Sequence, residues 1–338
     1  MSERVLPSKL KPVSLIAMTA LLGLIPIFAV GSGTEFSADI LIYAIMAVGL
    51  YVQLSLLGLV NFGFSAFFGV GGYLGAIFIM NTTRDLFLSL GFTIVICSLI
   101  ALLFGLVALR TRQTAFTMIT LAFAQLLYVL ALADDRWTGG VNGLTGVPRP
   151  RLPTALREFG LSVDSDAGFY YFVLMLFLLT LMGVWILQRS RMGSVFAGIR
   201  ENEERMTVLG FPVFTYKLAG FVISGVIGGY AGYLNALLFG FAGPGALFWT
   251  TSGEALLMLI LGGTTTLAGP VLGAAVFIGI SHYAVSYTDH WRLFVGITFI
   301  AIVMFAPLGL VSIAKSRLRG WRQLKTPNKS QLAKEVTP

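Results

Sequence analysis

Few residues in this chain could do chemistry, and those few lie within long apolar stretches. Glu254 is the one acid well placed near such a stretch and away from an obvious loop. The uncharged polar residues within apolar stretches are Gln53, Asn61, Gln125 and Asn235. Ion-coupled transporters and proton pumps usually keep ionisable groups at membrane depth. The scarcity of ionisable residues in the apolar stretches of this chain argues against an ion-coupled mechanism and against a pore lined with charge.

The sequence lacks the motifs of common nucleotide, metal and hydrolytic sites. No GxxxxGK[ST] pattern occurs, so the chain does not bind ATP through a P-loop. It has no HExxH motif, and no GxSxG motif in a strand–turn–helix context. Two histidines, His282 and His290, and the single Cys97 provide neither a zinc cluster nor a disulfide framework. We therefore expect no catalytic residue and no metal site, and we expect the energy source of any active process to lie outside this chain.

The composition is that of a membrane protein. Only 11% of the 338 residues are charged, against about 25% in an ordinary soluble domain. Apolar stretches long enough to cross roughly 30 Å of hydrocarbon as a helix recur along the chain. These stretches are continuously apolar and do not alternate, which excludes a β-barrel. We predict an all-α polytopic membrane protein with about 8–10 transmembrane segments.

The net charge of +8 is concentrated at the two ends of the chain. A basic head, residues 1–12, and a basic tail, residues 314–338, carry the whole surplus. Basic ends can indicate nucleic-acid binding, but beside apolar spans they more simply mark the cytoplasmic side. The apolar stretch at 13–30 is longer than the roughly 7–15 residues of a signal-peptide core. We therefore expect a retained first span and cytoplasmic N- and C-termini.

Alternation of the spans organises the transmembrane domain, residues 13–313. Glu35 and Asp39 suit an external loop after the first span. The stretch 38–80 is too long for one crossing, so we predict that it folds back at 58–63. Residues 252–288 form a hairpin with its bend at 261–270, and the arm 252–262 reaches only about 16 Å, so it either spans or re-enters. The other predicted spans are 86–109, 114–133, 169–187, 213–240 and 291–313.

Two longer polar segments connect predicted spans, and alternation of the spans places them on opposite sides of the membrane. The loop 134–168 is rich in glycine and proline, which indicates a constrained external loop. Residues 188–217 form an internal island with four arginines and three glutamates. Within it a short amphipathic helix is predicted, with Val195, Ile199, Met206 and Leu209 on one side. This helix could transmit force from a partner, or the island could be a solvated loop.

Several further residues and segments have two possible interpretations each. Glu254 is either a pathway residue or a cap on its helix arm. Asn61 is either a substrate contact or a turn residue. The Gly-rich breaks at 58–63 and 262–270 are each followed by a Gly-Ala step. Paired interruptions can mark an internal repeat around a transport pathway, although Gly-Ala pairs are also common where helices pack.

Five blocks in order resemble a known family, the permease subunits of branched-chain amino acid ABC importers of the LivM type. The resemblance covers residues 38–313, and no single block is specific. The blocks are GLVNFGFSAFFGVGGY at 58–73, TMITLAFAQLLYVL at 117–130, TGGVNGLTGVP at 138–148, GSVFAGIRENEERMTVLG at 193–210 and EALLMLILGGTTTLAGPVLGA at 254–274.

The resemblance implies a fold, partners and a location. The fold is that of an ABC importer transmembrane domain in a bacterial inner membrane, working by alternating access. The implied partners are a second related permease, two ABC ATPases and a periplasmic or lipid-anchored binding protein. ATP and magnesium would be bound by the ATPases, with no cofactor on this chain and no enzyme activity of its own.

The resemblance also assigns roles to residues. The segment 193–210 would be the cytoplasmic helix that couples to the ATPase, through Gly193, Arg200, Glu203, Glu204 and Gly210. The interrupted segments and the resemblance together indicate a substrate path. This path would include Asn61, Ser65, Gly71, Gly72, Glu254, Gly262, Gly263 and Thr264. The binding protein would dock on Trp137, Thr138, Gly139, Gly140 and Asn142.

Two departures from the family pattern bear on partner and substrate. Arg205 and Met206 stand where small residues are usual, and residues 61–64 read Asn-Phe-Gly-Phe where many members have Ser-Leu-Gly-His. Branched-chain or other apolar amino acids are the expected substrates. Urea and short-chain amides are the alternative within this permease type. A self-contained ion-coupled secondary transporter and a membrane scaffold without transport are the alternatives of other classes.

Overall fold

The computed structural model describes residues 32–111, 113–151 and 165–287, with positions 163, 293, 296, 297, 300, 304 and 309. The predicted first span, the basic head and tail, and most of the span at 291–313 lie outside these residues. Part of the predicted loop 134–168 lies outside them too.

Seven described helices are long and apolar enough to cross a membrane, which confirms the all-α polytopic class. They are α3 (Ser32–Tyr51), α4 (Phe64–Asn81), α5 (Leu86–Ala108), α6 (Gln113–Ala133), α8 (Asp166–Arg189), α11 (Val213–Phe239) and α13 (Ala268–Tyr287). The shorter elements are a π-turn η1 (Val52–Leu56), η2 (Gly140–Asn142), β1 (Leu144–Thr145), α9 (Arg191–Glu201), α10 (Glu203–Val208), β2 (Phe241–Ala242), η3 (Pro244–Leu247) and α12 (Trp249–Gly262).

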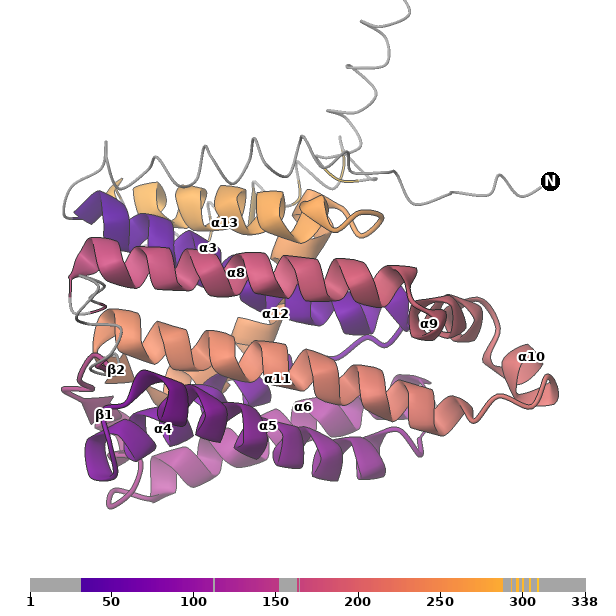
Figure 1. Cartoon of the computed structure of the whole chain (residues 1–338), viewed down its shortest axis with the longest axis horizontal. Helices are drawn as coiled ribbons and strands as arrows, with labels where there is room; N and C mark the ends of the chain where they lie inside the picture. The colour runs from indigo at the N-terminus through magenta and orange to yellow at the C-terminus, as the bar shows by residue number, and fades with distance from the viewer. Residues whose placement is uncertain are drawn as a thin grey trace, which may run out of the picture.

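The long helices run side by side along the long axis of the molecule (Figure 1). In the most apolar 18-residue stretch of α3, α4 and α11, 72–78% of the residues are buried, against 22% in the corresponding stretches of α5 and α6. α3, α4 and α11 therefore form the core. The outward faces of α5 and α6 carry exposed apolar side chains such as Val95, Leu103 and Val129, which suit hydrocarbon or an apolar partner.

The start of α3 corrects one prediction. Glu35 and Asp39, expected in an external loop, are helical residues, because α3 begins at Ser32. Glu35 lies in the first turn, where the helix dipole favours a carboxylate. Glu35 therefore marks the beginning of the helix, and Asp39 lies about one turn further along it.

The predicted interruption at 58–63 is present. The helix loosens into η1 before this point, and the chain resumes as α4 at Phe64. Gly58 has a φ of +74°, a left-handed conformation that glycine adopts without steric cost. The chain can therefore reverse here and form two helices where one would be too long.

Helices α4 and α11 approach each other through glycine. A Cβ at Gly71 would lie 1.8 Å from the Gly229 carbonyl oxygen, and one at Gly232 would lie 1.7 Å from the Phe68 carbonyl oxygen. Neither distance is sterically possible. The glycines thus allow the backbones of α4 and α11 to touch, whereas larger apolar side chains would hold the two helices apart.

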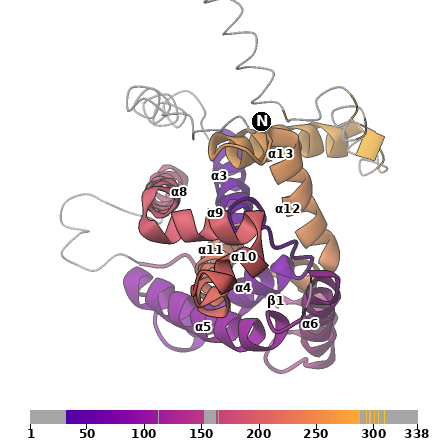
Figure 2. The same ribbon diagram turned by 90° about the vertical axis from the view of Figure 1, so that its right-hand side faces the viewer.

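The predicted hairpin at 252–288 is formed by α12 and α13, with its bend inside the predicted 261–270. α12 has 14 residues, or about 21 Å of helix, and it is not among the seven described helices that could span. It runs across the bundle at a steep angle to the long helices (Figures 1 and 2). The first arm of the hairpin is therefore shorter than the roughly 30 Å thickness of a hydrocarbon core.

The connections gather at two opposite ends of the bundle. α9 and α10 lie at the right-hand end of Figure 1, the α9 end. β1 and β2 lie at the left, the β1–β2 end, where they pair antiparallel with Leu144 opposite Ala242. The bundle thus separates the segments that alternation of the spans places on opposite sides of a membrane.

The glycine contact gives a stability prediction. We expect Gly232→Ala to destabilise the purified chain by about 1–3 kcal/mol, because the added methyl must push α4 away from α11. Thermal unfolding in detergent measures the change. Gly91→Ala on α5 is the matched control, since a Cβ there would meet nothing within 4 Å. Equal unfolding temperatures for the two variants would contradict the close contact.

Candidate functional site

The polar segment, residues 190–210, lies across the α9 end of the bundle, as Figure 2 shows end-on. Ser190 starts it: its Oγ accepts a hydrogen bond from the Gly193 N–H at 3.2 Å and so caps α9. A Cβ at Gly193 would lie 2.3 Å from the Leu187 carbonyl oxygen. The turn from α8 into α9 is therefore tight and requires glycine.

One face of α9 is buried against the bundle. Val195, Phe196 and Ile199 are at most 9% exposed. Phe196 packs against Gly220 of α11, where a Cβ would come 3.1 Å from the ring. α9 is therefore docked on the core helices.

Arg200 joins α9 to the interruption after α3. Its Nη1 donates a hydrogen bond to the Ser55 carbonyl oxygen in η1. Its side chain also packs over Gly58, where a Cβ would lie 3.2 Å from Arg200 Cγ. A charged donor therefore satisfies a carbonyl near the point where the regular helix ends, and a movement of α9 would act on this break.

The predicted single helix is in fact two. Asn202 has an extended backbone, with φ −160° and ψ 102°, and its Oδ1 accepts from the Arg205 N–H at 2.8 Å. It therefore ends α9 and caps α10, because an asparagine side chain competes with the helical backbone for hydrogen bonds. α10 then ends in a Schellman motif. The Phe211 N–H donates to the Met206 carbonyl at 3.1 Å, and Gly210 has a φ of +85°.

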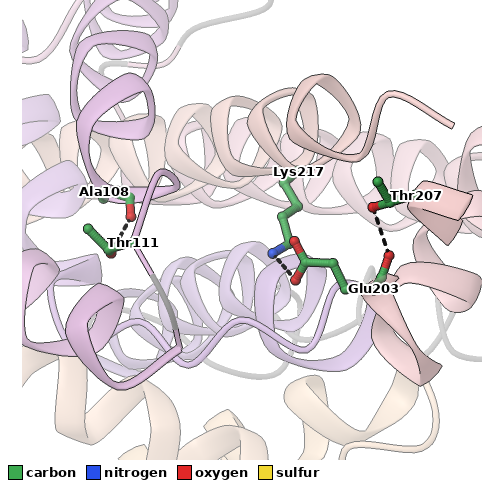
Figure 3. Close-up of polar contacts among 5 residues, drawn as sticks. All are labelled: Ala108, Thr111, Glu203, Thr207 and Lys217. Carbon is green, nitrogen blue, oxygen red and sulfur yellow. Dashed lines mark hydrogen bonds and ion pairs between the residues drawn. The ribbon is translucent and has the colours of Figure 1, made fainter. Parts of the chain in front are cut away.

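Glu203 and Lys217 form an ion pair between α10 and the start of α11 (Figure 3). The Lys217 side chain is 12% exposed, whereas that of Glu203 is 52% exposed. The same figure shows Thr207 donating to the Glu203 carbonyl oxygen at 3.0 Å. α10 is thus tied back to the bundle by this ion pair and by Met206, which packs against the cluster of Val195, Ile199 and Val213, although none of its residues is fully buried.

The outer surface of the polar segment combines charge with exposed apolar side chains. Glu204 and Arg205 are exposed, and Val208 and Leu209 are 87% and 64% exposed. The prediction that Leu209 lies on the same side of one helix as Val195 and Ile199 is wrong, because the break at Asn202 changes the direction of the helix. Charged residues beside exposed apolar ones are typical of a surface that contacts another protein.

The predicted pathway residues at the start of α4 are held inside the subunit. The Asn61 side chain is 1% exposed; its Nδ2 donates to Gln53 Oε1 at 2.8 Å, and its Oδ1 accepts from the Gly63 N–H at 2.7 Å. The Ser65 N–H donates to Ser252 Oγ at 2.7 Å. These contacts connect the interruption after α3 to α12, a connection that the sequence did not reveal.

The other predicted pathway residues lie in separate places. Gly71 and Gly72 face α11, as described above for Gly71, while Gly262 and Gly263 pack against the first turn of α13. Thr264 and Glu254 are partly exposed. The structure therefore does not bring all eight residues into one site.

A cavity of about 230 Å³ lies between α3, α4, α11 and the segment 241–251. Gly72 is the one predicted pathway residue that lines it. Tyr43, Tyr73 and Phe239 line it as well and were not singled out from the sequence. Asn235 also lines it, and its place as a polar residue within an apolar span was the one available signal.

The predicted docking loop forms an ordered turn at the β1–β2 end. Thr138 Oγ1 donates to the Ala131 carbonyl oxygen at 2.6 Å, and Gly139 and Gly140 both have positive φ. Trp137 is 63% exposed, and Asn142 is exposed too. The loop therefore presents an aromatic side chain from a backbone held by internal hydrogen bonds.

A bundle of membrane-spanning helices with a docked polar segment at one end is the architecture of a multi-pass membrane protein. The family model described as "Branched-chain amino acid transport system / permease component" matches residues 34–303. The chain belongs to this family. It is a permease subunit of an ABC importer and a multi-pass inner-membrane protein.

Two relatives support this assignment. The "High-affinity branched-chain amino acid transport system permease protein LivM" of Escherichia coli is 26% identical over 310 residues, which are 86% of this chain and 73% of the relative. The protein of the same name from Salmonella typhimurium is 25% identical over the same shares. No solved structure matches the chain at a significant level.

The cap at Asn202 gives a second prediction. We expect Asn202→Ala to speed amide hydrogen exchange in residues 203–208 about fivefold, because loss of an N-cap costs roughly 1 kcal/mol. Asn202→Asp keeps an acceptor at the same place and should exchange as the unchanged chain does. Mass spectrometry of the purified protein measures the exchange of both variants. If Asn202→Ala exchanged at the same rate as the unchanged chain, Asn202 would not stabilise α10 as an N-cap.

Proposed function

We propose that this chain forms half of the translocation path of an ATP-driven importer of branched-chain or other apolar amino acids. The family match and the names of the two relatives support the substrate class. In this proposal two ABC ATPases hydrolyse ATP with magnesium, and a second related permease completes the path. The α9 end is then cytoplasmic, with both chain termini on that side, and the β1–β2 end faces outward.

The observation that carries the proposal is the two-sided polar segment. Its inner side is fastened to the bundle by buried Phe196 and by Arg200, while Glu204, Arg205 and Val208 project outward. A surface that transmits force must be rigidly attached on one side and accessible on the other. A solvated connecting loop would need neither property.

Arg200 extends the coupling role toward the path. Because it binds the Ser55 carbonyl and covers Gly58, an ATPase that displaces α9 would displace the break between α3 and α4. The break is itself hydrogen-bonded to α12 through Ser65 and Ser252. Alternating access would then proceed by movement of these contacts, with the interrupted segments as the moving parts.

The β1–β2 end offers the surface for a binding protein. Trp137 and Val141 are 63% and 77% exposed on the ordered loop, and large exposed aromatic and apolar residues are favoured at such contacts. Thr138, Gly139, Gly140 and Asn142 would set the shape of this surface. The binding protein would deliver substrate here.

The alternative substrates, urea and short-chain amides, would use the same machinery. The sequence Asn-Phe-Gly-Phe at 61–64 and the uncharged lining of the cavity leave this alternative open. An ion-coupled transporter is the alternative of another class, and it would transport as a purified single chain. Uptake that requires the ATPases and ATP excludes it.

Charge reversal on the exposed surface tests the coupling role. In proteoliposomes that contain the whole importer, we expect Glu204→Arg with Arg205→Glu to lower ATP-dependent leucine uptake about tenfold, because mismatched contacts at an interface cost at least roughly 1–2 kcal/mol. Arg84→Glu, an exposed reversal at the other end, is the matched control and should keep its uptake per ATP hydrolysed.

A charge swap separates docking from internal support. Glu203→Lys alone breaks the ion pair with Lys217, and Glu203→Lys with Lys217→Glu restores it with reversed sign. If Glu203 only supports α10, the swap recovers uptake; if it also contacts an ATPase, the swap stays impaired. Normal uptake in the Glu204/Arg205 double variant would reject the docking surface.

A further inference from the structure

The cavity near the β1–β2 end has the size of a small metabolite. Its volume is about 230 Å³, below the roughly 300–1,000 Å³ typical of sites for drug-sized ligands. It lies between three core helices and the segment that returns after α11. Gly72 and Gly232 line it and contribute no side chain, and Gly232 also takes part in the close contact between α4 and α11.

Most of the wall is apolar and aromatic. Phe68, Phe239, Phe241 and Ala236 line the cavity. None of the lining residues is charged. Such a wall favours an aliphatic group and disfavours a ligand with an unbalanced charge.

Two polar groups in the wall lack partners. The Tyr73 hydroxyl and the Asn235 amide nitrogen are covered by protein, and neither has a hydrogen-bond partner among the residues that the structure describes. A buried polar group left unpaired costs about 1–3 kcal/mol. Both groups can donate to an oxygen, so a ligand with a carboxylate or carbonyl oxygen would satisfy them.

The Tyr43 side of the cavity has the opposite character. Tyr43 lines the cavity, and Asp39 and Glu254 are near enough to act on it electrostatically. One Asp39 oxygen has no partner within the described ranges. Carboxyl oxygens beside this wall can accept a hydrogen bond from a ligand that carries an ammonium or amide N–H group there.

We infer that this cavity is a substrate subsite within the permease subunit, for one small molecule with an aliphatic part and with an oxygen acceptor and an N–H donor at its polar end. The oxygen binds Tyr73 and Asn235, the aliphatic part packs on Phe68 and Phe239, and the nitrogen faces Tyr43. An apolar amino acid and a short-chain amide both have this chemistry. The inference rests on the proposed function and names the site where that function holds its substrate.

The test uses the reconstituted importer with L-leucine and acetamide as separate radiolabelled probes. We expect Tyr73→Phe and Asn235→Leu each to raise the KM for the transported probe about tenfold, through loss of one hydrogen bond to the ligand. Tyr73→Phe should not lower the unfolding temperature, because its hydroxyl has no internal partner to lose. A merely structural role for Tyr73 would lower stability and leave KM unchanged.

Tyr233→Phe is the matched control. It removes a buried hydroxyl that is already paired with Ser89 at 2.6 Å, so it should lower stability and leave KM as it was. Uptake of leucine alone identifies an amino acid as the ligand, and uptake of acetamide alone identifies an amide. Unchanged KM values in both cavity variants overturn the subsite while the importer still works. A complete importer that takes up neither probe overturns the proposed function and the subsite together.

Discussion

The interruption between α3 and α4 is the constraint on which the rest of the structure depends. Wherever a helix stops within a membrane bundle, its free backbone groups must find partners inside the protein. Here they find them on several elements. Arg200 of α9 binds the Ser55 carbonyl, Thr117 of α6 donates to the Val60 carbonyl at 3.1 Å, and Asn61 accepts from the Gly63 N–H. The break is therefore a junction of helices that are far apart in sequence.

This junction links the two ends of the molecule. From the break, Ser65 reaches Ser252 and the Leu247 carbonyl, which belong to the segment returning from the β1–β2 end. α9 reaches the same break from the opposite end. The residues at 52–65 are therefore in contact with segments that come from both ends of the bundle.

Close backbone contact has a second consequence in this fold. Gly71, Gly229 and Gly232 let α4 touch α11, which seals the core where these helices meet. The same absence of side chains at Gly72 and Gly232 leaves the cavity beside that contact. Gly232 therefore belongs both to the close helix contact and to the wall of the cavity, and no charged residue lines that cavity.

The amino-acid sequence by itself determined the class of the protein, the spans near 86–109, 114–133, 169–187 and 213–240, the break at 58–63 and the hairpin bend. These depend on apolar length, glycine and proline, which are local properties. The five ordered motifs also pointed to the family. Tertiary structure alone decided that α12 lies across the bundle, that Asn202 divides the polar segment, and that Leu209 is exposed. It alone brought Tyr43, Tyr73 and Asn235 around one cavity. The physical reason is that these features depend on which residues, distant in sequence, pack together. A polar residue within an apolar span has the same sequence context whether its hydrogen-bond partner is a neighbouring helix, its own backbone or a ligand.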